Sequence, residues 1–160
     1  MTRQTLEKIV VASLMVICYL VMPKVGYNDD SSIASHLLYI FSHANMWHLA
    51  GNLFVFILIK GNHYLLPSVP IAIFASFIPS FGVVWPIDGV TMGFSGVLFA
   101  IAGTKYGIFC HRSRNKHQAY RAFFMRALPF SLIGIFVPHL NWCIHTYCLL
   151  AGFAYGRCKG

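Results

Sequence analysis

Acidic residues are scarce in this chain, and charge of either sign is sparse. Only 10% of the 160 residues are charged and 58% are apolar, and the four acidic side chains are Glu7, Asp29, Asp30 and Asp88. Soluble domains carry about 25% charged residues, so the composition predicts a membrane protein. Asp88 is the single acidic residue near Ser95 in the sequence, so there is almost no candidate for the acid of a Ser-His-Asp triad.

Paired cysteines are also missing. The five cysteines include no C-x-x-C pair, so neither a disulfide framework nor a zinc site is predicted, and we expect no metal and no cofactor. No A-x-A-like cleavage site follows the first apolar run, which we therefore interpret as a retained helix and not as a signal peptide.

The basic residues account for a net charge of +8, which raises the question of nucleic-acid binding. Half of them lie in one block, residues 105–126, and the others flank apolar runs. This placement is typical of topogenic charge that faces the cytosol and anionic lipid. We expect the bilayer as a partner and no nucleic acid.

Six apolar segments can be drawn, at residues 9–22, 46–59, 64–85, 91–109, 127–137 and 142–155. A partly apolar loop through His43, a basic loop at 111–126 and a turn at 138–141 join some of them. With the N-terminus inside, all Lys and Arg except Lys24 fall at inner ends, as the positive-inside rule requires. The sequence predicts one all-α domain over residues 1–160, a bundle of six transmembrane helices with both ends in the cytosol.

A G-x-S-G sequence, from Gly93 to Gly96, opens the fourth segment near its outer end. Ser95 shares a helical face with Phe99, while Gly96 and Ala100 form a neighbouring seam of small residues. Such a sequence is often only a helix contact, and it is not the G-x-S-x-G elbow of soluble hydrolases. Ser95 is a candidate nucleophile.

His145 lies one turn into the sixth segment, and Cys148, Gly152 and Gly156 follow on its face. An ionisable residue inside a membrane segment is a functional candidate, although a histidine bonded to a backbone carbonyl is the alternative. We predict that His145 is the base for Ser95.

A third polar cluster opens the second segment. His48 and Asn52 are spaced i and i+4, so they project from one helical face, and His43 precedes them. Two donors converging there are suited to an oxyanion, a metal or a polar network. Four polar residues lie at a similar depth, roughly 3 to 9 Å below the outer ends of their helices: His48, Asn52, Ser95 and His145.

These patterns together resemble the rhomboid family of intramembrane serine proteases. The matching elements are H-x4-H-x3-N at His43, His48 and Asn52, G-x-S-G at residues 93–96, and His145 opening the last helix with Gly152 seven residues later. The chain departs from the family pattern in lacking a Trp-Arg pair in the first outer loop, in Cys148 where glycine is usual, and in Phe99 where tyrosine is frequent.

The resemblance implies a Ser95–His145 dyad without an acid. It further implies an oxyanion hole formed by His48, Asn52 and the Ser95 backbone N–H, and an aromatic ring, Phe99, stacked on the histidine. Around this dyad, the small or packing residues are Gly93, Gly96, Phe99, Cys148 and Gly152.

We therefore expect a serine endopeptidase that cleaves single-span transmembrane proteins near the outer face of the cytoplasmic membrane of a bacterium. Two alternatives remain open. One is a non-catalytic rhomboid-like protein that binds or escorts membrane clients. The other is a haem or metal membrane protein that uses His48, His145 and His43.

Overall fold

The computed structural model describes residues 2–59, 64–79, 90–137 and 140–160, and every regular element in these ranges is a helix. In chain order they are α1 (Arg3–Val21), α2 (Ile33–Leu38), the short 3-10 helix η1 (Tyr39–Phe41), α3 (Met46–Leu58), α4 (Leu65–Ser76), α5 (Ser95–Arg112), α6 (Lys116–Ala122), the π-helical η3 (Phe123–Ala127), α7 (Leu128–Leu132), the 3-10 helix η4 (Ile133–Ile135) and α8 (Trp142–Lys159). The predicted all-helical class is confirmed for the described part of the chain.

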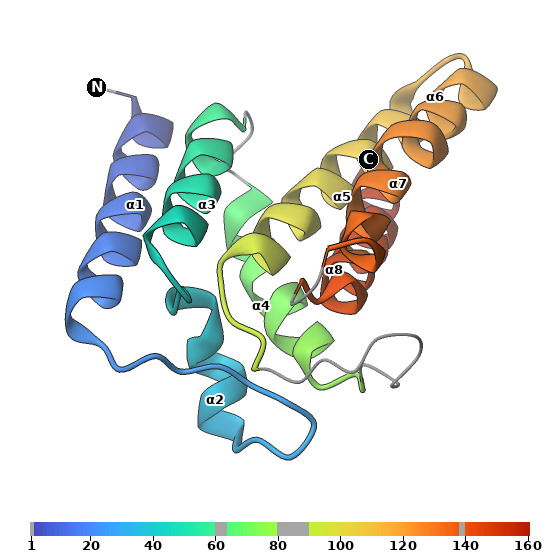
Figure 1. Cartoon of the computed structure of the whole chain (residues 1–160). Helices are drawn as coiled ribbons and strands as arrows, with labels where there is room; N and C mark the ends of the chain where they lie inside the picture. Colours follow the sequence, from blue (N-terminus) through green and yellow to red (C-terminus); the bar gives the residue numbers. More distant parts are fainter. Residues whose placement is uncertain (1, 60–63, 80–89, 138–139) are drawn as a thin grey trace.

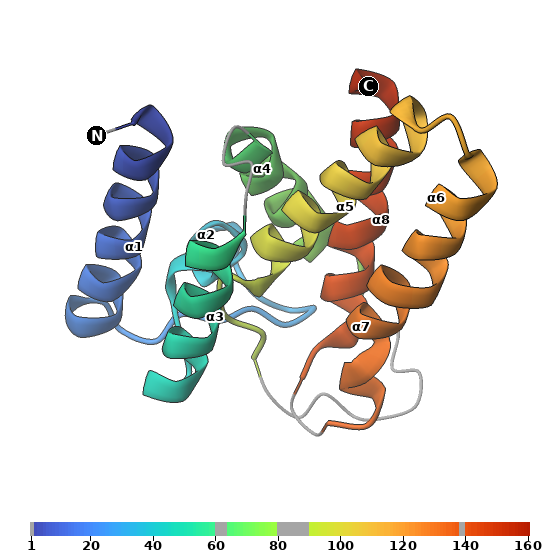
Figure 2. The same cartoon turned by 90° about the horizontal axis from the view of Figure 1, so that it is seen from above.

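The helices α5 and α8 form the centre of the molecule. They pack against each other, and α4 contacts both. In two perpendicular views, α1 and α3 lie on one side of this pair and α6 and α7 on the other (Figures 1 and 2). The segment that leads into α5 therefore lies between the two sides of the fold.

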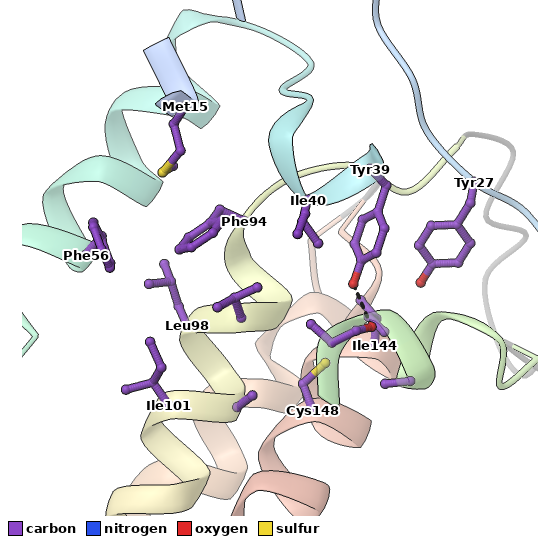
Figure 3. Packing of buried hydrophobic residues seen from close by; sticks show 14 of the residues in the cluster. Met15, Tyr27, Tyr39, Ile40, Phe56, Phe94, Leu98, Ile101, Ile144 and Cys148 are labelled. Carbon is purple, nitrogen blue, oxygen red and sulfur yellow. Dashed lines mark hydrogen bonds between the residues drawn. The ribbon is translucent and has the colours of Figure 1, made fainter. Parts of the chain in front are cut away.

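A hydrophobic core joins the start of α5 to its neighbours (Figure 3). The Phe94 ring packs edge-on against Phe56 of α3, with ring centroids 5.5 Å apart. Tyr39 is buried, and its hydroxyl donates a hydrogen bond to the Ala72 carbonyl of α4 over 2.8 Å. Met15 of α1 completes this cluster. These contacts fix η1, α3 and α4 around the residues that precede Ser95.

In the part of the chain that is described, α1 alone is both long and apolar enough to cross a membrane by composition. In α1 the buried residue is Met15, and α3 and α4 are shorter apolar helices.

Capping explains several boundaries that differ from the sequence prediction. The hydroxyl of Thr2 accepts the Thr5 N–H over 3.2 Å, so α1 begins at Arg3 and not at residue 9. Ser32 caps α2, so the predicted loop through His43 contains α2 and η1. A short polar side chain before an apolar run satisfies amide groups that a helix leaves open.

The predicted basic loop at 111–126 is wrong, because most of it is helical. Asn115 caps α6 by accepting the Gln118 N–H over 3.0 Å. Ala119, Phe123 and Ala127 are buried at a helical spacing, and the chain stays helical through η3, α7 and η4. The predicted fifth helix at 127–137 is thus the later part of a longer helical stretch.

The other segments are confirmed in part. The second, at 46–59, matches α3 closely. The third was predicted over 64–85, but α4 ends at Ser76, where Pro79 disfavours a helical residue before it; residues 80–89 lie outside the described residues. The sixth continues beyond residue 155 to Lys159 because Gly156 packs on α5.

The predicted start of the fourth helix at residue 91 is wrong. Thr91 instead forms an isolated antiparallel bridge with Tyr27, with N–H···O distances of 2.9 and 2.7 Å, and α5 begins at Ser95. Of the predicted turn at 138–141, residues 138 and 139 lie outside the described residues, and Asn141 is the N-cap of α8.

Candidate active site

A tight turn at Gly93 presents Ser95 as the first residue of α5. Gly93 has φ of 121°, a left-handed conformation that favours glycine, and its N–H donates to the Tyr39 carbonyl over 2.9 Å. A Cβ at this position would lie 2.7 Å from Cε1 and Nε2 of His48. Glycine is therefore required here both by the backbone and by the imidazole ring that contacts it.

The Ser95 hydroxyl meets the His145 imidazole across the contact between α5 and α8. The Oγ atom lies 2.8 Å from Nε2, an ordinary hydrogen-bond distance. His145 is 5% exposed, so its ring is largely shielded from water, whereas Ser95 is partly exposed. When Nδ1 carries the ring proton, Nε2 accepts from the hydroxyl, which is what a general base for a serine nucleophile requires.

Phe99 holds the imidazole ring from one face. It lies one turn after Ser95 on α5, and its ring stacks on His145 with centroids 4.5 Å apart and an interplanar angle of 24°. On the Phe99 ring packs Phe130 of α7, at 5.7 Å. Aromatic stacking of this kind contributes about 0.5–1.5 kcal/mol, and it restricts the rotation of the histidine ring.

Glycines allow the backbones of α5 and α8 to touch behind this pair. A Cβ on Gly152 would collide with the carbonyl oxygen of Ala100, and a Cβ on Gly103 would collide with that of Leu149. Gly107 and Gly156 meet carbonyl oxygens of the facing helix in the same way. The contact extends along both helices and brings their backbones into direct contact.

Cys148 is part of the same contact near Ser95. Its side chain is fully buried, and its Sγ lies 3.3 Å from the place where a Cβ on Gly96 would stand. The predicted packing residues Gly96, Cys148 and Gly152 thus all lie between α5 and α8. The thiol fills the space that glycine at position 96 leaves.

His48 and Asn52 project from α3 toward the turn before Ser95. The His48 ring contacts Gly93, and Nδ2 of Asn52 lies 3.4 Å from the position of a Cβ on that glycine. Nδ2 of Asn52 is buried and has no hydrogen-bond partner among the described residues. A buried donor without a partner costs free energy, so a ligand oxygen at this place would gain a hydrogen bond.

His43 lies behind His48 in the loop that leads to α3. It is 1% exposed, and the two imidazole rings pack edge to face at 5.2 Å. Burial, followed by the neighbouring His48, lowers the pKa of His43 to about 4, so this ring is neutral at pH 7. His43 therefore packs against His48 as a buried neutral ring.

Three site residues escaped the sequence prediction. Asn45 caps α3 by accepting the His48 N–H over 2.9 Å, and Asn141 caps α8 by accepting the Ile144 N–H over 3.2 Å. Asn141 also donates to Thr91 over 2.7 Å. An asparagine immediately before an apolar run is a helix-start signal, which would have found both caps, whereas nothing in the sequence indicates the bond to Thr91.

Across the ranges that the structure describes, no three His, Cys, Asp or Glu side chains are grouped closely enough to hold a metal ion. No protein-family profile matches the chain, and no curated protein matches it either.

Proposed function

We propose that this protein is a serine endopeptidase of the rhomboid type that cleaves membrane-anchored proteins within the bilayer. The observation that carries the proposal is the 2.8 Å contact between Ser95 Oγ and His145 Nε2, from two different helices, with the imidazole stacked on Phe99. A serine paired with a buried, oriented histidine is the minimal machinery of nucleophilic acyl transfer.

In the proposed reaction the Ser95 oxygen attacks the carbonyl carbon of the scissile peptide and passes its proton to Nε2 of His145. The resulting imidazolium then protonates the leaving amine as the carbon–nitrogen bond breaks, which leaves an acyl ester on Ser95. A water molecule, deprotonated by the same imidazole, hydrolyses the ester and restores the serine. Stacking on Phe99 takes the orienting role that an aspartate has in a triad.

The carbonyl oxygen of the substrate becomes an oxyanion in the tetrahedral intermediate. The donors proposed for it are the imidazole of His48, the side-chain amide of Asn52 and the backbone N–H of Ser95. Asn52 supports this assignment because its buried Nδ2 has no partner among the described residues. A single oxyanion donor contributes about 3–4 kcal/mol to such a barrier.

A membrane location agrees with the surface of the helices. Large apolar side chains are strongly exposed on several of them, including Leu20 (73%), Phe54 (65%), Leu66 (86%) and Phe74 (74%). Extended exposed apolar surface marks a lipid or protein contact. We propose six spans, formed by α1, α3, α4, α5, the stretch from α6 through η4, and α8, with both ends in the cytosol.

Contacts between helix ends are consistent with this topology. The ammonium group of Lys8 donates to the carbonyls of Ile57 and Ile59, so the start of α1 lies beside the end of α3. Gly160 packs against His111, so the ends of α5 and α8 are also neighbours. In this topology the inner ends of the helices carry most of the Lys and Arg in the sequence, as expected for the cytosolic face of a bacterial inner membrane.

The proposed substrates are single-span transmembrane proteins cut near the outer face. Ser95 and His145 lie at the first turn of α5 and the first full turn of α8, which are the outer ends in this topology. A scissile amide inside a helix is already hydrogen-bonded and shielded, so substrates with a helix that unwinds easily are favoured.

The test is cleavage of a single-span model substrate by detergent-purified protein. The wild type should cleave it, and Ser95→Ala and His145→Ala should each abolish cleavage while expression persists. Ser13→Ala is the matched control, because Ser13 is exposed on α1 and should be dispensable. Cleavage by Ser95→Ala at the wild-type rate would end the proposal.

A fluorophosphonate probe addresses the non-catalytic alternative. An active enzyme should be labelled at Ser95, with labelling lost in Ser95→Ala and retained in Ser13→Ala. A wild type that neither cleaves nor becomes labelled would favour a rhomboid-like binding protein.

A further inference from the structure

Two hydrogen bonds connect the same two segments of the chain, four residues apart in each. Nδ2 of Asn141 donates to Oγ1 of Thr91 over 2.7 Å, and Ser95 Oγ lies 2.8 Å from His145 Nε2. Thr91 precedes Ser95 by the same interval by which Asn141 precedes His145. The two bonds are therefore successive cross-links between the segments 91–95 and 141–145.

Asn141 uses both ends of its amide. Its Oδ1 accepts the Ile144 N–H over 3.2 Å and so caps α8, while its Nδ2 donates to Thr91. The side chain is 6% exposed, so water competes little for either bond. One buried amide thus determines where α8 begins and where that beginning lies relative to the segment before α5.

Thr91 is itself held in place. Its backbone exchanges two hydrogen bonds with Tyr27, and two residues later the Gly93 N–H donates to Tyr39. The backbone that leads to Ser95 is therefore anchored on the N-terminal part of the fold. A shift of α8 relative to Thr91 would be a shift of His145 relative to Ser95.

The glycine contact between α5 and α8 cannot supply this register alone. Backbone packing at Gly103 and Gly152 sets how far apart the helices lie, but van der Waals contact is weakly directional along the helix axis. A slip of one residue moves a helix by about 1.5 Å, enough to break a 2.8 Å hydrogen bond. A second directional bond, four residues earlier in each segment, prevents such a slip.

We propose that Asn141 and Thr91 are positioning residues that hold His145 in hydrogen-bonding register with Ser95. This inference rests on the proposed function, because its consequence is measured in the catalytic step. Neither Asn141 nor Thr91 contributes to the Ser95–His145 hydrogen bond itself. The bond between Asn141 and Thr91 acts by fixing the position of α8, which carries His145.

The test separates the two tasks of Asn141. Asn141→Ser keeps a hydroxyl that caps helices about as well as asparagine, but serine is too short to reach Thr91. Thr91→Val removes the acceptor at constant shape and leaves the cap of α8 intact. Thr91→Ser retains the hydroxyl and should restore activity.

We expect kcat to fall about tenfold in Asn141→Ser and in Thr91→Val, with KM unchanged, since small misplacements of a catalytic group lower the rate of the chemical step. The rate loss in the double variant should be smaller than the product of the two single losses, because the two substitutions remove one bond in common. Labelling of Ser95 by the fluorophosphonate probe should slow in parallel. Thr104→Val is the matched control, because the Thr104 hydroxyl bonds the Ala100 carbonyl within α5 and should not affect kcat.

Unchanged kcat in Thr91→Val, or rate losses that multiply in the double variant, would overturn the inference. If Asn141→Ser does not fold, the comparison of Thr91→Val with Thr91→Ser decides it alone. A wild type without cleavage or labelling would instead count against the proposed function, so the two failures are distinct.

Discussion

The two central helices and the two helices beside them are packed in opposite ways. On α5 half of the residues are buried, namely Gly96, Val97, Leu98, Ala100, Ile101, Gly103, Thr104, Gly107 and Cys110. In contrast, α1 buries Met15, and α3 buries Leu49, Asn52 and Phe56. One region is held by backbone contact along a glycine seam, and the other by a few side chains.

This difference separates the parts of the proposed site. The nucleophile and the base lie on α5 and α8, where packing is tight and their relative position is defined. The proposed oxyanion donors His48 and Asn52 lie on the lightly packed α3 and approach Ser95 through the turn at Gly93. Overpacking the contact between α5 and α8 should therefore affect folding and catalysis together, whereas loss of a donor side chain on α3 should affect catalysis with little effect on folding.

The largest expected effect tests the lightly packed side. Asn52→Ala should lower kcat by about a hundredfold or more, the typical cost of one lost oxyanion donor. The melting temperature should hardly change, because Nδ2 of Asn52 has no partner to lose among the described residues. Cleavage kinetics and thermal melting of the purified protein give both values.

Asn115→Ala is the control for this variant. It removes the cap of α6, so it should lower stability by about 1 kcal/mol while leaving kcat unchanged. An Asn52→Ala protein that unfolds readily but cleaves normally would contradict the division between the two regions.

The next effect contrasts two glycines. Gly152→Ala should destabilise the protein by about 1–3 kcal/mol through overpacking, because the new Cβ would collide with the Ala100 carbonyl oxygen. Gly51→Ala on α3 should stabilise it by about 0.5–1 kcal/mol, because nothing lies within 4 Å of that position. Equilibrium unfolding in detergent measures both, and shifts of the same sign would refute the contrast.

A smaller effect is expected for the ring that stacks on the base. Phe99→Leu should lower kcat about tenfold or less, in line with the energy of one aromatic contact, and Phe99→Tyr should retain the activity. Phe54→Leu is the matched control, since Phe54 is 65% exposed on α3. Equal kcat for the two leucine variants would show that stacking does not orient His145.

The smallest effect concerns pH and the loop before α3. Burial lowers the pKa of His43 from 6.5 to about 4. Between these two pH values the folded state therefore binds fewer protons than the unfolded state. Stability from His43 is complete above pH 6.5 and declines as the pH falls toward 4, by less than about 1 kcal/mol at pH 6. In His43→Leu the melting temperature should depend less on pH between pH 7.5 and 6 than it does in the wild type. An equal dependence in the two proteins would argue against a buried neutral ring.

Helix positions could be predicted from the sequence where polar residues clearly bound an apolar run. The segment at 46–59 and the start of α8 were predicted closely, because the apolar run of each begins where its helix begins, at Met46 and Trp142. The helices within 111–126 were not predicted, because charged residues surround the helical repeat of Ala119, Phe123 and Ala127. This repeat faces α8, where the Phe123 and Phe153 rings stack, a contact that the local sequence does not indicate.

The start of α5 could not be read from the sequence. Hydropathy extends the segment back to residue 91, but pairing of Thr91 with Tyr27 and the positive φ of Gly93 hold residues 91–94 out of the helix. Both depend on contacts between residues far apart in the chain. Local propensity carries no information about such contacts.

The sequence by itself determined which chemical groups are present and at what spacing: a serine between glycines, a histidine fifty positions later, and an i, i+4 pair of donors. Helical periodicity is a local property, so it also determined the faces on which these groups lie. The tertiary structure decided that Ser95 and His145 are 2.8 Å apart and that Asn141 bonds Thr91. Those distances depend on how closely two glycine-lined helices approach and in what register, which follows from packing of the whole chain and not from any one segment.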